Sequence, residues 1–178
     1  MNLREVDWRI KPLHHVMVGF EAGLDAIREL SDGAEWFDAT HASEHAEPLF
    51  GLGFVAAQIY ALGTVSDLNG VRMSRGKSKK EKLDCYACDT VKLKGDVTRI
   101  QLINAAANYF KHHDEWKTRW PTNGHGAQDV KTLGDVGISE KTEFPCTHAV
   151  ELLGTSYKLI VLHQILKEWR KHLFSTLL

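Results

Sequence analysis

Residues 48–69 form a stretch that is apolar on every side when it is arranged as a helix. The segment reads PLFGLGFVAAQIYALGTVSDLN, and its aromatic and branched side chains leave no continuous polar face. A helix that is hydrophobic all round is buried, so we expect this one at the centre of the fold. Pro48 suits its first turn and Gly70 suits its end. Gln58 lies among apolar neighbours and, when buried, needs hydrogen-bond partners.

Helical periodicity continues along most of the chain. Apolar residues recur at spacings of three and four, without convincing β-type alternation. The pattern predicts an all-α fold, an antiparallel helical bundle of four long helices plus short helices, in a single domain over residues 1–178. The long helices are expected at 13–30, 48–69, 96–117 and 156–176, and the short ones near 127–133 and in FPCTHAVELLG. Two segments interrupt the pattern, a basic loop insertion at 70–95 and a long loop at 118–143.

The composition is typical of one globular domain. The chain has 178 residues, of which 43% are hydrophobic and 25% are charged, and its net charge is −1 with histidine neutral. This balance gives no global attraction to nucleic acid or to an anionic membrane. The first twenty residues carry charges and Pro12 where a signal peptide needs an apolar stretch. No run reaches the roughly twenty apolar residues of a membrane span, so we expect a soluble cytoplasmic protein with no membrane contact.

The motif HASEH at 41–45 fits the H-x-x-E-H pattern of a zinc peptidase. In that interpretation His41 and His45 bind the metal, and Glu44 acts as the base. Both histidines must then share one face of a helix. Pro48 opposes this, because it lacks a backbone donor and disfavours helical angles in the residue before it. The alternative interpretation is a polar entry to the helix at 48–69.

Three cysteines and one histidine offer a second metal hypothesis. Cys85 and Cys88 form a C-x-x-C pair that, with Cys146 and His148, has the ligand types of a structural zinc site. A second C-x-x-C is missing, and three cysteines do not make a disulfide framework. Ordinary reduced thiols are the alternative, and we predict no metal and no cofactor.

The segment 72–82 carries six basic residues, opposed by one glutamate. Such a run is usually a solvated loop, and its alternative is a patch for nucleic acid or for a protein partner. In the nucleic-acid interpretation the phosphate contacts come from Arg72, Arg75, Lys77, Lys79 and Lys80.

The stretch NYFKHHDEW at 108–116 closes a helix with a very wide apolar arc. A helical wheel places His113 and Trp116 on the apolar side, so we expect both in the core. The remaining narrow strip is polar, and it either faces solvent or lines a groove. The strip contains Gln101, Asn104, Asn108, Lys111, His112 and Glu115.

An all-helical domain with an asparagine four residues before a histidine near a helix end resembles the HEPN superfamily, the higher eukaryotes and prokaryotes nucleotide-binding domain. The resemblance implies metal-independent RNA cleavage in bacterial defence or toxin–antitoxin systems. Asn108 and His112 would then be the catalytic residues, with Lys111 as a phosphate contact. The family's arginine position falls on Ala107, and this departure favours an inactive or non-nuclease member. The resemblance further implies RNA or nucleotide as ligand and a homodimer.

A second function class remains open from the sequence. The chain is then a non-enzymatic protein-binding module, such as an antitoxin or an immunity protein, which neutralises a partner. The contact surface would be a helix face or the polar loop at 118–143.

Overall fold

The computed structural model describes residues 3–33, 37–116, 119–124, 126–154 and 156–178. Within these ranges the chain is all-α, as predicted, and an isolated bridge between Lys92 and Thr98 is the one β-type pairing. The four long helices of the prediction are α1, α2, α4 and α7. The elements are η1 (Leu3–Glu5), α1 (Ile10–Gly33), α2 (Ala39–Ser74), α3 (Lys82–Ala87), η2 (Lys94–Asp96), α4 (Arg99–His112), α5 (Ala127–Asp135), α6 (Pro145–Leu152) and α7 (Ile160–Leu177).

α2 begins at Ala39, so the prediction that this helix starts at Pro48 was wrong. Asp38 caps the helix, because its carboxylate accepts the N–H of Thr40 at 2.8 Å and that of His41 at 3.1 Å. Pro48 lies inside the 36-residue helix, where it removes one backbone donor. The cap and the turns on either side of the proline outweigh that single lost hydrogen bond.

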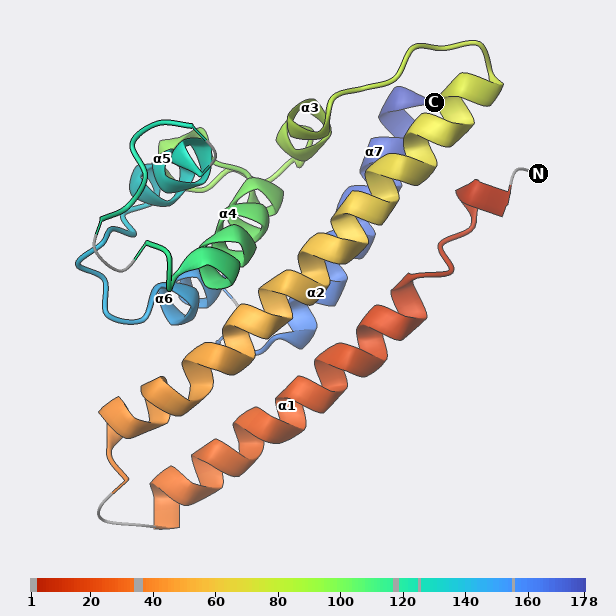
Figure 1. Ribbon diagram of the computed structural model, residues 1–178. Helices are drawn as coiled ribbons and strands as arrows, with labels where there is room; N and C mark the ends of the chain where they lie inside the picture. The colour runs from red at the N-terminus through yellow and green to blue at the C-terminus, as the bar shows by residue number, and fades with distance from the viewer. Residues whose placement is uncertain (1–2, 34–36, 117–118, 125, 155) are drawn as a thin grey trace.

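α2 is the central helix of the bundle, as predicted, and packs against α1, α4, α6 and α7. Figure 1 shows α1 on one side of α2 and the shorter helices α3 to α6 on the other. α1 is antiparallel to α2, whereas α7 is parallel to it, because Leu159 packs at Gly53 and the carbonyl of Leu177 bonds to Arg72. One core joins all seven α-helices of the described residues, and its members include Met17, Phe54, Tyr86, Ile103, Leu133, Ala149 and Trp169.

α2 is also long and apolar enough to cross a membrane, judged by length and composition alone. More than half of its most apolar window is buried inside the protein. A central core helix has the same two properties.

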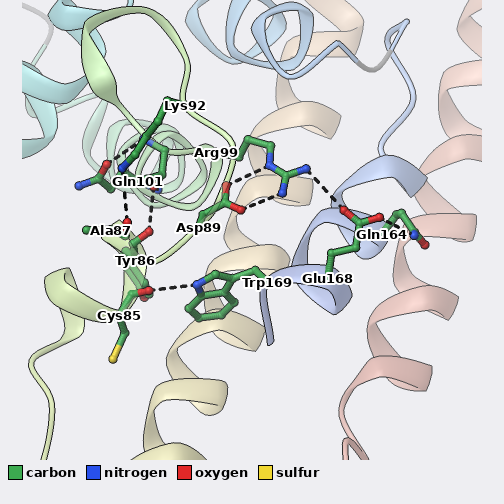
Figure 2. Close-up of polar contacts among 11 residues, drawn as sticks. Cys85, Tyr86, Ala87, Asp89, Lys92, Arg99, Gln101, Gln164, Glu168 and Trp169 are labelled. Carbon is green, nitrogen blue, oxygen red and sulfur yellow. Dashed lines mark hydrogen bonds and ion pairs between the residues drawn. The ribbon is translucent and has the colours of Figure 1, made fainter. Parts of the chain in front are cut away.

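A polar cluster joins the end of α3, the start of α4 and α7 (Figure 2). Arg99 donates to both carboxylate oxygens of Asp89, at 2.8 and 3.0 Å, and reaches Glu168 at 3.6 Å. These hydrogen bonds to the Asp89 carboxylate raise the pKa of the Arg99 guanidinium above its usual value. Trp169 Nε1 donates to the carbonyl of Cys85 at 3.0 Å. These contacts fix α3 against α4, which matters because α3 contributes to the pocket described below.

Both segments predicted as loops contain more helix than the pattern indicated. α2 continues to Ser74 and α3 occupies Lys82–Ala87, so 70–95 is not one continuous loop. α5 lies within 118–143, close to the short helix expected at 127–133. Gly70 does not end α2, which continues to Ser74, and its lack of a side chain leaves room for Arg4 to lie against the helix.

Candidate functional site: a polar pocket beside α4

The polar strip of α4 lines a cavity of about 330 Å³. We call this cavity the polar pocket. Residues from the starts of α3 and α5 complete its wall, so three helices build it. Its lining residues are Lys82, Asn108, His112, Glu115, Trp116, Gly126 and Asp129.

A ladder of side-chain amides lies behind the wall of the polar pocket and reaches it at Asn108 and Asp129. Gln58 of α2 donates through Nε2 to Oδ1 of Asn104 at 2.9 Å and to Oδ1 of Asn108 at 2.8 Å. The two asparagines in turn donate through Nδ2 to Asp129, at 3.1 and 2.9 Å. Lys111 Nζ donates to Oε1 of Gln58 at 2.8 Å. The partners that Gln58 was predicted to need are therefore present, and they orient Asn108 rigidly.

Burial shifts the pKa values of two side chains in this network, Asp129 and Lys111. The pKa of Asp129 is raised because burial disfavours its charged form, although hydrogen bonds from Asn108 and Asn104 oppose the shift. Desolvation lowers the pKa of Lys111, against the attraction of Asp129. Lys111 therefore serves the amide ladder, and it does not line the polar pocket as the phosphate contact that the sequence predicted.

His112 is the exposed histidine of the polar pocket. Its Nδ1 lies 3.3 Å from Oε2 of Glu115, and its ring stacks on Trp116 with an interplanar angle of 15°. A carboxylate at Nδ1 favours the tautomer with the proton on that nitrogen. Nε2 then keeps its lone pair and is the basic nitrogen of the ring.

His113 is not the core residue that the helical wheel predicted. Its side chain is 42% exposed, and its Nδ1 lies 2.6 Å from the carbonyl oxygen of Phe110. His113 keeps helical angles, but it is the C-cap residue of α4, so it lies at the end of the helix, where its side chain is only half-buried. Trp116 is buried as predicted, although it lies beyond the helix.

The residue at the position where the HEPN resemblance expects an arginine is part of the hydrophobic core. Ala107 is fully buried, and the cation of the polar pocket comes instead from Lys82 at the start of α3. The sequence placed Lys82 in the basic run at 72–82, apart from Asn108 and His112, and it did not indicate Asp129. Two features of the sequence could have pointed to them. Lys82 is the last residue of the basic run, and Asp129 is an acid in the first turn of the helix expected at 127–133.

Most of the predicted phosphate contacts in the basic run serve the fold. Arg72 is buried in α2 and donates to the carbonyls of Ser78 and Leu177. Lys77 donates to the carbonyl of Leu178, and Arg75 pairs with Glu5 at 2.7 Å. Cations at the ends of α2 and α7 complement the negative ends of the helix dipoles. Arg72 is therefore not free to bind a phosphate, whereas Lys79 and Lys80 lie on the loop beyond.

Neither candidate metal site, the HASEH motif or the cysteine set, forms a cluster of ligands among the described residues. Among the described residues, no three His, Cys, Asp or Glu side chains are arranged to hold a metal ion. Cys146 lies beside Glu47, and burial raises the pKa of its thiol well above the usual value. Burial also raises the pKa of Cys85, to about 11. Both are therefore protonated thiols, which fits the alternative of ordinary cysteines.

Comparison with protein-family models, with curated proteins and with solved structures found no match to this chain. The HEPN resemblance therefore rests on Asn108 and His112 and on the helical fold, and it stays a prediction.

Proposed function

We propose that the polar pocket binds RNA and cleaves it, in the manner of the HEPN-like proteins of bacterial defence and toxin–antitoxin systems. The observation that carries the proposal is that Asn108 and His112 share one cavity with Lys82 and Asp129. These four residues come from three helices, and the amide ladder holds Asn108 in place. A cation, a histidine and an amide can each contact a phosphate ester. The lining also holds two carboxyl groups: that of Asp129, whose pKa is raised by burial, and that of Glu115, which lies against Nδ1 of His112.

In this proposal His112 is the general base. Its Nε2 takes the proton of a ribose 2′-hydroxyl, and the 2′-oxygen forms a bond to phosphorus. The bond from phosphorus to the 5′-oxygen breaks, and the leaving oxygen takes a proton from water. Lys82 offsets the charge that develops on the phosphate. Asn108 can direct its second amide hydrogen to a phosphate oxygen, since Asp129 takes only one.

We expect the cleavage to be slow. Lysine supplies a point charge, whereas the arginine of the family motif supplies a planar bidentate donor. In this chain the arginine position is the buried Ala107.

The test compares two neighbouring histidines. Single-stranded RNA is incubated at low salt, in the presence of a chelator, with the wild type, His112→Ala or His113→Ala. We expect the wild type to leave 2′,3′-cyclic phosphate ends, His112→Ala to be slower by at least about 100-fold, and His113→Ala to match the wild type. Equal rates for both variants, or RNA that neither binds nor breaks, would refute the proposal.

A second candidate is the protein-binding module. An apolar groove of about 320 Å³ lies between the start of α1 and α2, and Trp8 and Ile59 beside it are 60% and 64% exposed. Exposed apolar patches mark interaction surfaces. In this alternative the chain binds no RNA and instead neutralises a toxin encoded by a neighbouring gene. Growth of cells that express both proteins measures the neutralisation, and Ile59→Asp should abolish it.

A further inference from the structure

A second cavity, of about 460 Å³, lies between the N-terminal segment and the last turns of α2. We call it the basic pocket. Three cationic side chains line it against a single carboxylate. The residues that matter are Arg4, Arg9, Asp67, Asn69, Gly70 and Lys79.

Two glycines of α2 leave room for the arginine side chains of the N-terminal segment to pack against the helix backbone. A Cβ atom at Gly63 would lie 2.7 Å from Nε of Arg9, and one at Gly70 would overlap the guanidinium of Arg4. The glycines are seven residues apart, which is about two helical turns, so they share one face of α2. Both arginines therefore lie directly against the helix backbone, in positions set by the fold.

The acids near the basic pocket already have partners. Asp67 pairs with Arg9 and lies 3.4 Å from Arg170. Glu5 pairs with Arg75, outside the cavity lining. Arg9 belongs to the same lining as Asp67, so this pair cancels, and the three cations against one carboxylate still leave the lining with a net positive charge. A positive cavity with arginine in its wall suits a phosphate group.

A short basic segment joins the basic pocket to the polar pocket. Lys79 lines the first and Lys82 lines the second. Three residues of extended chain span at most about 11 Å. Asn69 clamps the segment to α2, since its Oδ1 accepts the N–H of Lys80 at 2.8 Å and its Nδ2 donates to the carbonyl of Lys80 at 3.0 Å. Figure 1 shows this segment leaving the end of α2 and leading to α3.

We propose that the substrate is single-stranded RNA several nucleotides long, which occupies both cavities at once. The basic pocket takes a backbone phosphate while the reacting phosphate lies in the polar pocket. Grooves of this kind follow the backbone of a single strand over roughly 4–16 nucleotides. This inference rests on the proposed function, because the polar pocket must bind RNA for the strand to bridge the two.

The test measures RNA binding as a function of length. Fluorescein-labelled 2′-O-methyl oligouridylates, a dinucleotide and a decanucleotide, are titrated by fluorescence anisotropy, since they lack the 2′-hydroxyl and are not cleaved. We expect Lys79→Ala to weaken decanucleotide binding about tenfold and to reduce the salt slope by about 0.7. The dinucleotide, which fits the polar pocket alone, should bind the variant as it binds the wild type. Lys141→Ala, on an exposed loop, controls for the loss of one charge.

The outcomes separate this inference from the proposed function. If Lys79→Ala binds the decanucleotide as tightly as the wild type does, the RNA does not reach the basic pocket, and the inference is wrong while the proposed function stands. If the wild type binds neither oligonucleotide, both are wrong. Gly70→Ala provides a second variant, because its methyl group displaces Arg4, and it should also weaken only the decanucleotide.

Discussion

Gln58 is the residue that connects the central helix to the polar pocket. It is 4% exposed, and its amide group donates to two asparagines and accepts from Lys111. A buried amide with all of these partners orients its neighbours, because each unmet hydrogen bond in the interior has a cost. The pocket wall therefore depends on a residue that does not itself line the pocket.

Replacing Gln58 with leucine should destabilise the fold by about 1–3 kcal/mol, because buried acceptors on Asn104 and Asn108 lose their donor. Urea unfolding gives the change in free energy. Gln164→Leu is the matched control, since Gln164 lies on the exposed face of α7 and bonds only to Glu168 among the contacts described. Equal losses in the two variants would contradict the role assigned to Gln58.

Asp129 should make stability depend on pH. Its pKa in the folded protein is raised by burial, so the folded state holds the proton more tightly than the unfolded chain does. The stability that this group contributes is full below 3.8, the ordinary pKa of an aspartate, and is lost as pH rises through the folded pKa. Asp129→Asn removes that loss, so its stability relative to the wild type should increase with pH across this window.

Urea unfolding at a series of acidic to neutral pH values measures the effect. The asparagine variant starts from a lower baseline, because one of its two acceptors becomes a donor facing an amide. The change with pH, not the baseline, is the test. A difference between variant and wild type that stays constant with pH would show that the Asp129 pKa is not raised.

At the scale of elements, the largest difference between the structure and the sequence-based prediction is the start of α2, which lies at Ala39 and not at Pro48. Pro48→Ala should stabilise the protein by about 1–3 kcal/mol, because it restores a hydrogen bond inside an existing helix at an exposed position. Pro12→Ala is the control, since Pro12 lies in the first turn of α1, where the missing N–H has no helical partner. A change at Pro48 as small as the control would mean that the helix begins at Pro48.

The helices could be predicted from the sequence because apolar spacing marks their buried faces. Their ends were less predictable, since the cap at Asp38 overrides a proline ten residues later only once the surrounding turns are formed. Asn108 and His112 were identified from one helix. Lys82 and Asp129 were missed because tertiary packing, which the pattern does not contain, brings α3 and α5 to the same cavity.

At the scale of the whole molecule, the long central helix carries two candidate binding surfaces, which adjoin at Arg9, a residue that lines both the basic pocket and the apolar groove. The polar pocket and the basic pocket are linked by the segment that follows α2, whereas the apolar groove lies between α1 and α2. RNA and a protein partner would therefore use different surfaces. The location of the bound ligand distinguishes the two functions.

The most direct measurement is an NMR titration of the isotope-labelled protein with a non-cleavable 2′-O-methyl RNA oligonucleotide. The account predicts chemical-shift changes at the side-chain amide of Asn108, the imidazole of His112 and the backbone amide of Gly126, all of which line the polar pocket. The side-chain signals of Ile59 at the apolar groove should stay unchanged. Changes confined to the apolar groove, or no changes at all, would contradict the assignment of the polar pocket as an RNA site.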